Sequence, residues 1–119
     1  MSIILIVDDQ EVNLQILELM TRRTCCDAIV VKAGNGEEAV SLYKELTKNG
    51  YNIRQVITDF HMPKMDGGEL SKTLRKLGYD KLIVMLTSDE NIEQVNYPDV
   101  NRVFYKPLTR KLINEILEY

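Results

Sequence analysis

The sequence predicts a doubly wound α/β domain built on a parallel sheet, and two observations support that prediction. Short apolar runs typical of buried strands alternate five times with segments whose apolar residues recur at helical spacing. Alternating strand and helix units form a mostly parallel sheet with helices on both faces. No linker, repeat or low-complexity segment interrupts this pattern, so we expect one domain over residues 1–119.

The expected strands are short runs rich in apolar and β-branched residues. The first, Ile3–Val7, is continuous and typical of a central parallel strand that is covered on both faces. The other four expected strands are Ala28–Val31, Gln55–Asp59, Leu82–Leu86 and Val103–Tyr105.

Helices are expected between these strands because apolar residues there recur every three or four positions. The first runs from Gln10 to about Arg23, with Val12, Ile16, Leu19 and Met20 as its inward stripe. The second ends near Gly50 and turns Ala39, Val40, Tyr43 and Leu46 inward. The third runs over Gly68–Leu77, where Leu70, Leu74 and Leu77 recur at helical spacing. The last helix has an apolar face formed by Leu108, Leu112, Ile113, Ile116 and Leu117. The Asp89–Asn96 segment has Ile92 and Val95 alone at helical spacing, so a helix there should be short and poorly anchored.

Composition narrows the class of protein. The chain is 45% hydrophobic and 28% charged, which is typical of a soluble globular domain. A net charge of −3 without a basic tract argues against a direct nucleic-acid partner. No apolar run approaches a membrane span, so we expect a cytoplasmic protein without membrane insertion. Adjacent cysteines rarely satisfy disulfide geometry, and Cys25 and Cys26 are interpreted as reduced thiols without a function.

Polar residues follow four of the five expected strands. They are Asp8-Asp9, Asp59, Thr87-Ser88 and Lys106. Because parallel strands end at the same edge of a sheet, we expect these side chains to converge, where ligands bind in open α/β sheets. Three neighbouring carboxylates repel one another unless a cation compensates. Hard oxygen ligands without a Cys or His cluster favour Mg²⁺.

Such a site suits phosphoryl transfer. A carboxylate can act as the nucleophile that receives a phosphoryl group, and catalysis then consists largely of positioning and charge neutralisation. Asp59 is the expected acceptor because it stands alone on the middle strand, whereas Asp8 and Asp9 form a metal-holding pair. Lys106 and the Thr87 hydroxyl are expected to contact phosphoryl oxygens.

Each of these residues also has a simpler interpretation. Asp59 could cap a turn, and Asp8-Asp9 could begin the following helix. Thr87 could bond to the backbone, and Lys106 could be a solvated charge. The coincidence of all four at successive strand ends favours a functional site.

These motifs resemble the receiver domain of two-component response regulators, over the whole chain. The resemblance is carried by Val7-Asp8-Asp9, Asn35–Ala39, Thr58–Gly67, Leu86-Thr87-Ser88 and Lys106-Pro107. It implies the CheY-like, flavodoxin-like (βα)5 fold with strand order 2-1-3-4-5. Met62–Gly67 is most similar to receivers of hybrid sensor kinases or phosphorelays.

The resemblance also implies roles at the site. Asp59 would accept a phosphoryl group from a phosphohistidine on a sensor histidine kinase or a histidine-phosphotransfer protein. Asp9 and Asp59 would bind Mg²⁺ through their side chains, Asp8 would assist, and the backbone carbonyl of His61 would complete the protein ligands.

Further roles follow from the same resemblance. Lys106 would contact the phosphate, with a cis bond to Pro107. Thr87 would swing toward the phosphoryl group, and the small Ser88 would leave room for it. A downstream target would bind the surface formed by Asp89–Asn96, the last strand and the last helix. Phosphorylation would act there by shifting a pre-existing equilibrium.

Two positions are unusual or ambiguous. His61 could bind a metal through its imidazole, but one imidazole among carboxylates favours a solvent-facing side chain whose carbonyl alone matters. Within the resemblance, His61 and Asp89 tune how fast the aspartyl phosphate hydrolyses. Val103 stands where receivers usually have an aromatic residue, and the aromatics Phe104 and Tyr105 follow it, which puts the usual output switch in question.

Three other functions compete with this hypothesis. A Mg²⁺-dependent phosphohydrolase would carry a second acid where His61 stands. A docking module without chemistry would not need Asp59 and Lys106. A flavodoxin-like cofactor binder would need a phosphate-binding loop after the first strand. The Met1 start favours a stand-alone receiver over one cut from a larger protein, and the sequence names neither kinase, target nor oligomeric state.

Overall fold

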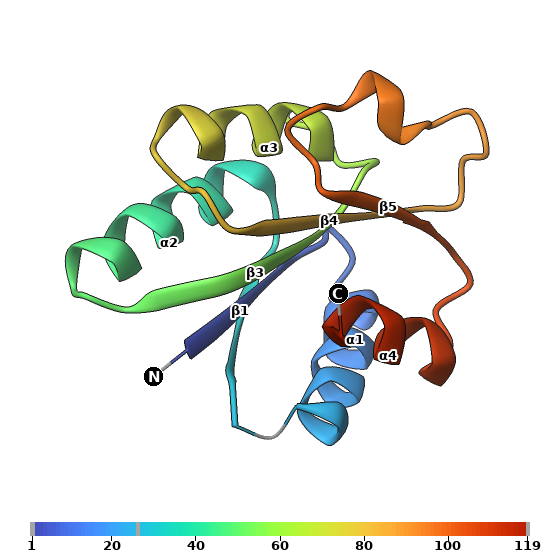
Figure 1. Ribbon diagram of the computed structural model, residues 1–119, viewed down its shortest axis with the longest axis horizontal. Coiled ribbons are helices and arrows are strands. Elements are labelled where there is room, and N and C mark those ends of the chain that lie inside the picture. Colours follow the sequence, from blue (N-terminus) through green and yellow to red (C-terminus); the bar gives the residue numbers. More distant parts are fainter. Residues whose placement is uncertain (1, 26, 119) are drawn as a thin grey trace.

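The chain folds into a parallel sheet covered by helices on both faces, as a computed structural model of residues 2–25 and 27–118 describes it (Figure 1). In chain order the elements are β1 (Ser2–Val7), α1 (Glu11–Thr24), β2 (Ile29–Ala33), α2 (Gly36–Lys48), β3 (Asn52–Asp59), α3 (Gly67–Lys76), β4 (Leu82–Thr87), the 3-10 helix η1 (Gln94–Asn96), β5 (Arg102–Tyr105) and α4 (Arg110–Glu118). All strand pairs are parallel, in the order β2-β1-β3-β4-β5. The predicted fold class and strand order are confirmed. Cys26 lies outside the described residues.

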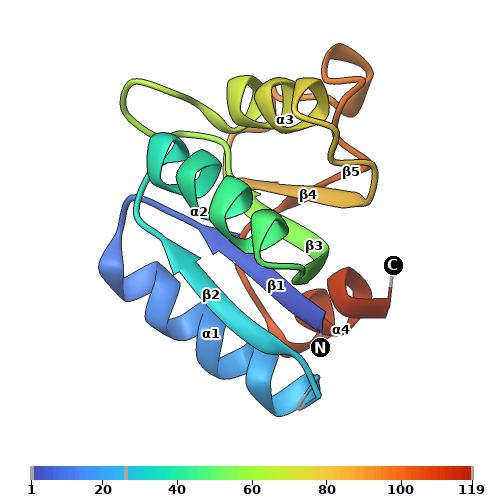
Figure 2. The ribbon, with the colours of Figure 1, turned by 90° about the vertical axis from the view of Figure 1, so that its left-hand side faces the viewer.

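The central strand explains why both faces are covered. In β1, Ile3, Leu5 and Val7 pack with α2 and α3, whereas Ile4 and Ile6 pack with α1 and α4. Each of the five is at most 1% exposed. A strand that alternates its side chains between two apolar layers needs apolar residues at every position. Figure 2 shows α2 and α3 on one side of the sheet and α1 and α4 on the other.

The strand β3 begins earlier than predicted. The expected start was Gln55, but the strand begins at Asn52, which is aligned with Ser2 of β1. Polar residues near this end hid the strand from an analysis based on apolar runs. Gln55 is buried, and its amide nitrogen donates to the carbonyl of Ile116 at 3.0 Å.

The inward face of α1 was predicted wrongly. Val12, Ile16 and Leu19 are 63%, 46% and 51% exposed, and Leu14 and Leu17 are buried instead. This helix is apolar on two faces, so its periodicity permits two stripes, and its packing against the sheet selects one. Met20 is partly buried against the core as expected. A smaller error of the same kind occurs after α3, where Leu77 is 41% exposed.

The connection between β4 and β5 contains the single turn η1 instead of a fourth full helix. This corrects the (βα)5 expectation, since the structure has four α-helices among its described residues. Ile92 is buried, but Val95 is 81% exposed. Two apolar residues do not provide a face that would hold a helix against the sheet.

Polar contacts hold this connection in place. The guanidinium of Arg75 on α3 donates to the carbonyls of Asp99 and Tyr79 at 3.0 and 2.9 Å and to Asn101 Oδ1 at 2.8 Å. The Gln94 side-chain amide donates to the Asn101 carbonyl at 2.5 Å and accepts from the Val103 amide at 3.4 Å. It thereby covers part of the edge of β5. None of the described helices is long and apolar enough to cross a membrane.

Candidate functional site

Three carboxylates meet at the carboxyl edge of the sheet, as the sequence predicts. Asp8 and Asp9 follow β1, Asp59 ends β3, and one oxygen from each lies within 4.8 Å of the others. Backbone hydrogen bonds continue past the ends of the strands and keep these residues aligned across the edge of the sheet. The Asp8 amide donates to the Ala33 carbonyl at 3.1 Å, and the Phe60 amide donates to the Leu86 carbonyl at 2.9 Å.

Asp8 is the most buried of the three acids. Asp8 is 5% exposed, and this burial raises the pKa of its carboxyl above the ordinary value of 3.8. The charge of Asp59 acts in the same direction, whereas the Gln10 amide, which donates to Asp8 Oδ1 at 2.9 Å, opposes the shift. A cation placed among the acids would relieve this penalty. The donor set, three carboxylates, fits Mg²⁺.

Lys106 lies beside the predicted acceptor. Its Nζ is 3.1 Å from Asp59 Oδ1, and both side chains are largely buried. The peptide bond between Lys106 and Pro107 is cis, as the resemblance implied. The Lys106 amide donates to the Thr87 carbonyl at 2.8 Å, which places the ammonium at the acidic edge. The interpretation of Lys106 as a solvated surface charge is therefore wrong.

Thr87 ends β4 next to this pair, and Ser88 follows it. Thr87 is fully buried, and its hydroxyl accepts a hydrogen bond from the Asp89 amide at 3.0 Å. In this state the hydroxyl is bonded to the backbone, which the sequence left open as the simpler interpretation. Register places Leu86 beside Asp59, so Thr87 comes one residue after the strand position that pairs with the acceptor. Ser88 is exposed.

His61 lies at the entrance of the site. Its side chain is 58% exposed, as the solvent-facing interpretation expects. The imidazole Nε2 is 3.4 Å from Asp89 Oδ2, and the ring contacts Phe60 edge to face at 4.8 Å. The two tuning positions therefore contact each other, which the sequence did not predict.

The loop after Asp59 is closed by a backbone hydrogen bond at a position that also requires glycine. The Gly67 amide donates to the Phe60 carbonyl at 2.8 Å. A Cβ at position 67 would lie 2.5 Å from the Asp59 carbonyl oxygen, so glycine is required. Asp66 then begins α3 with a capping box, in which its side chain accepts from the Glu69 amide at 2.8 Å.

The sequence analysis missed residues that complete the surroundings of the site. Asn13, on the first turn of α1, is among the groups that oppose the rise in the pKa of the Asp8 carboxyl. With Ile16, Lys106 and Leu108, among others, it lines a cavity of about 200 Å³ beside Asp8. Asn13 lies in the first turn of the helix that follows Asp8 and Asp9, and a polar residue at that place was the available signal.

The expected switch positions occupy opposite environments. Val103 is 8% exposed and packs into the core beneath α3. Tyr105 is 44% exposed, and its hydroxyl donates to the Ile92 carbonyl at 2.5 Å. Tyr105, one of the two aromatic residues of β5, therefore bonds outward to the β4–β5 connection.

Fold and site together define the receiver class, and comparison with known families agrees. The family model described as the response regulator receiver domain matches residues 4–118. The chain belongs to this family, whose members are signalling domains of two-component and phosphorelay systems.

The relatives found include both long and short proteins. The chain is 36% identical over 118 residues to the osmosensing histidine protein kinase SLN1 of Saccharomyces cerevisiae, covering 96% of this chain and 10% of the kinase. It is 35% identical over 120 residues to a chemotaxis protein CheY homolog of Campylobacter jejuni, covering 97% of this chain and 88% of that protein. The chain thus spans about a tenth of the kinase but most of the CheY homolog.

Solved structures share the fold. The response regulator TrrA of Thermotoga maritima, in complex with Mg²⁺ and BeF, superposes with a TM-score of 0.83 at 25% identity. That match covers 99% of this chain and 97% of TrrA. The Vibrio cholerae chemotaxis protein CheY4 superposes with a TM-score of 0.82 at 24% identity, over 99% and 97% of the two chains.

Proposed function

We propose that Asp59 accepts a phosphoryl group from a phosphohistidine in a Mg²⁺-dependent reaction and that this changes which partner the domain binds. One observation carries the proposal. The Asp59 carboxylate lies between two further acids and the Lys106 ammonium, 3.1 Å from its Oδ1. This arrangement supplies a nucleophile together with groups that neutralise phosphoryl oxygens.

Each residue has a defined task in this reaction. A free oxygen of Asp59 forms the new O–P bond while the P–N bond of the phosphohistidine breaks, and the imidazole leaves with the electron pair. Lys106 neutralises charge on a phosphoryl oxygen. Asp8, Asp9, Asp59 and the His61 carbonyl would hold Mg²⁺, which supplies further charge neutralisation when bound. TrrA was solved with Mg²⁺ and BeF, which supports this assignment.

The decisive experiment measures intact mass after incubation with acetyl phosphate. We expect a gain of one phosphoryl group that requires Mg²⁺ and is absent in Asp59→Asn. Lys64→Ala, an exposed change in the following loop, serves as a control that keeps the gain. A folded native chain that gains no mass in the presence of Mg²⁺ would instead support the docking module without chemistry.

The exposed stripe of α1 supports a docking surface for the phosphodonor. Val12, Ile16 and Leu19 lie on one face, and Ile16 also lines the cavity that contains Asp8 and Lys106. A donor protein with an apolar helical surface would bury this stripe and bring its phosphohistidine to Asp59. The proposed output surface is a separate one, formed by η1, β5 and α4, although α4 packs beside α1 on the same face of the sheet.

A single substitution separates donor docking from chemistry. Ile16→Asp should slow phosphoryl transfer from a phosphorylated histidine-phosphotransfer protein at least ten-fold, because it places a charge in an apolar interface. Phosphorylation by acetyl phosphate should not change. Gln15→Asp, on the exposed neighbouring position, is the control for added charge. Equal slowing by Ile16→Asp and Gln15→Asp would argue against the α1 surface.

A further inference from the structure

A groove separates α3 from the β4–β5 connection, on the side of the molecule away from α1 (Figure 1). Its volume is about 290 Å³. One wall is the beginning of α3, and the other is the segment from Asn96 to Val100. The groove follows from the single turn η1, because a full helix with an apolar face would pack over this region.

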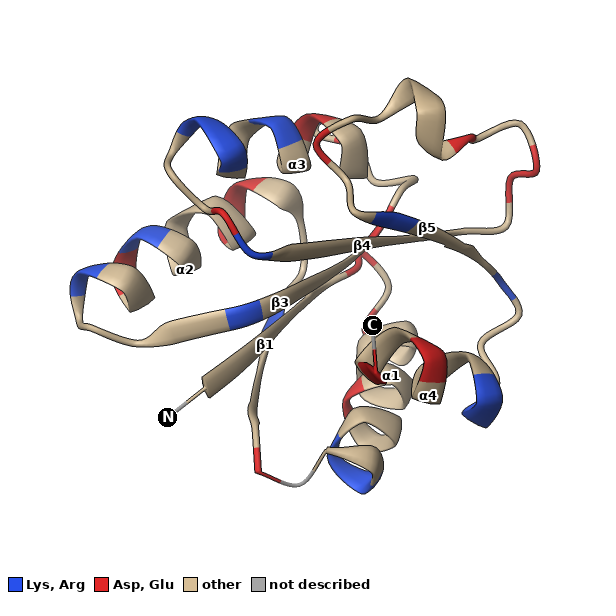
Figure 3. Cartoon of the chain, viewed as in Figure 1, with Lys and Arg blue, Asp and Glu red and all other residues tan. Residues whose placement is uncertain are grey.

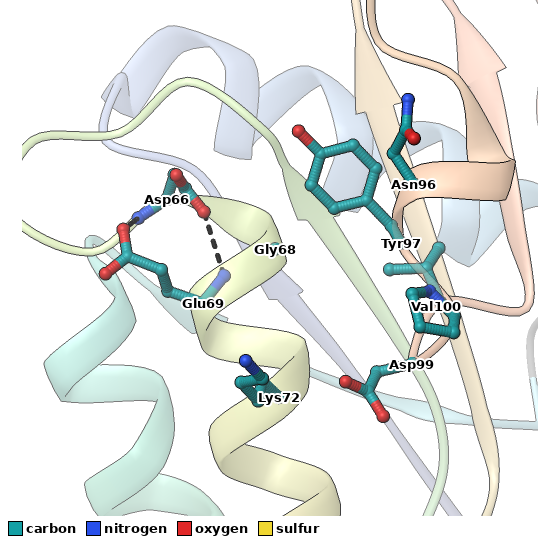
Figure 4. Close-up of a pocket in the computed structure, with 9 residues that line it drawn as sticks. Asp66, Gly68, Glu69, Lys72, Asn96, Tyr97, Asp99 and Val100 are labelled. Carbon is teal, nitrogen blue, oxygen red and sulfur yellow. Dashed lines mark hydrogen bonds between the residues drawn. The ribbon is translucent and has the colours of Figure 1, made fainter.

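The residues that line the groove carry more negative than positive charge. Asp66, Glu69 and Asp99 contribute three carboxylates, and Lys72 contributes one ammonium. Figure 3 shows acidic ribbon at the beginning of α3 and along the β4–β5 connection. In Figure 4, Asp66 and Glu69 lie across the groove from the Tyr97 ring, while Lys72 and Asp99 are at its other end. The end that contains Tyr97 is therefore the more acidic one.

Two of the acids are held in fixed positions. Asp66 Oδ1 accepts from the Glu69 amide at 2.8 Å, and Glu69 Oε1 accepts from the Asp66 amide at 3.2 Å. Each carboxylate uses one oxygen in this capping box and keeps a second oxygen for a ligand. A ligand would therefore find these carboxylates already oriented.

Tyr97 is fixed as well. Its ring contacts Phe60 edge to face at 5.4 Å. It also lies against Gly68, where a Cβ would be 2.8 Å from the ring carbon Cε1. A larger residue at position 68 would displace the ring. The half-buried ring thus forms a rigid aromatic wall opposite the two carboxylates.

We propose that this groove binds an arginine side chain presented by a partner protein. A guanidinium stacks on an aromatic face and binds carboxylates through several N–H donors, so it matches both walls at once. A bare metal ion would not use Tyr97, Pro98 and Val100, which form the apolar part of the lining. Docking here requires no phosphorylation, so the proposal stands apart from the proposed function.

Occupation of the groove has a direct route to Asp59. Tyr97 touches Phe60, and Phe60 follows Asp59 in the chain. A ligand that stacks on Tyr97 and moves its ring would therefore also affect Phe60, the residue next to the acceptor Asp59.

The test is a titration of the unphosphorylated protein followed by amide chemical shifts, with N-acetyl-argininamide as the probe. We expect saturable shifts at residues 66–72 and 96–100. N-acetyl-citrullinamide has the same shape without the charge, and it should bind at least five-fold more weakly. Absence of saturable shifts, or equal binding of the two probes, overturns the proposal.

Variants locate the binding. Glu69→Gln keeps an acceptor for the Asp66 amide, and it should weaken binding about two- to five-fold because one exposed charge contact is lost. Asp99→Asn, at the other end of the groove beside Lys72, should weaken binding less than Glu69→Gln. Glu45→Gln on α2 makes the same change in net charge away from the groove and should leave affinity unchanged. If Glu45→Gln weakens binding as much as Glu69→Gln, the attraction is long-range and the groove is not the site.

Discussion

The carboxyl edge of the sheet and the β4–β5 connection both gather polar groups, but they use them in opposite ways. At the edge, the carboxylates of Asp8, Asp9 and Asp59 lie close together, and the Lys106 ammonium pairs with Asp59. In the connection, Arg75, Gln94 and Tyr105 donate to backbone carbonyls. The edge therefore gathers charged groups around one site, whereas these three side chains hold an irregular segment in place by hydrogen bonds.

This difference separates a binding function from a structural one. Uncompensated charge costs stability in the free protein and becomes favourable when a cation or phosphoryl group arrives. Satisfied hydrogen bonds hold an irregular segment without the apolar burial that a helix would supply. The connection can therefore be loosened while the strands that carry the acids stay folded.

Two neighbouring residues of α3 test whether the hydrogen bonds of the β4–β5 connection have a structural role. Leu74 is fully buried beneath the helix, and Leu74→Ala should lower the free energy of unfolding by about 2–5 kcal/mol. Arg75→Met keeps the aliphatic stem but removes the guanidinium, and it should cost about 1–3 kcal/mol because partly buried carbonyls lose donors. Denaturant titration measures both effects.

Hydrogen exchange then separates the two kinds of loss. Leu74→Ala should speed exchange in α2, α3 and the sheet alike, because the whole core loses stability. Arg75→Met should speed exchange chiefly at residues 89–101. Uniform acceleration in Arg75→Met would show that the connection is part of the global folding unit, contrary to the comparison drawn above.

The sequence was sufficient for the sheet and for the acids at its edge. Parallel strands buried on both faces need continuous apolar runs, and Ile3–Val7 is one. Once such runs are located, the residues that follow them are placed at one edge by topology. Asp8, Asp59 and Lys106 were therefore predictable without coordinates.

Other features depend on packing that periodicity does not contain. Helix α1 has two apolar stripes, and the sheet buries the one with Leu14 and Leu17 while leaving Ile16 exposed. The pairing of His61 with Asp89 joins two loops far apart in the chain. Arg75 reads as an ordinary surface residue of a helix, and its contacts with the β4–β5 connection appear only in three dimensions.

The next test concerns the charged edge. Burial raises the pKa of the Asp8 carboxyl above 3.8, so the folded state holds that proton more tightly than the unfolded state. Stability of the metal-free protein should therefore fall as pH rises above 3.8 through the folded pKa. Asp8→Asn should raise the melting temperature in EDTA at pH 7, with the difference fading as the pH falls below 3.8.

With added Mg²⁺, the native chain should have a higher melting temperature than Asp8→Asn. The native chain should gain melting temperature with Mg²⁺, and Asp8→Asn should gain less, because a ligand that binds only the folded state stabilises it. Asp80→Asn, an exposed acid away from the edge, is the control and should behave like the native chain. A lower melting temperature for Asp8→Asn in EDTA would refute the idea that the edge is destabilised by its own charge.

The smallest expected effect belongs to Tyr105. Its hydroxyl donates to the Ile92 carbonyl at 2.5 Å, and Tyr105→Phe removes this bond while keeping the ring. The loss should be about 0.5–1.5 kcal/mol, since one hydrogen bond to a partly buried carbonyl is lost. Faster amide exchange should be confined to residues 89–96. Tyr51→Phe, at a ring that is 46% exposed, should change neither quantity. If exchange in the connection is unaltered in Tyr105→Phe, then Arg75 and Gln94 hold it alone, and Tyr105 has no part in the proposed switch.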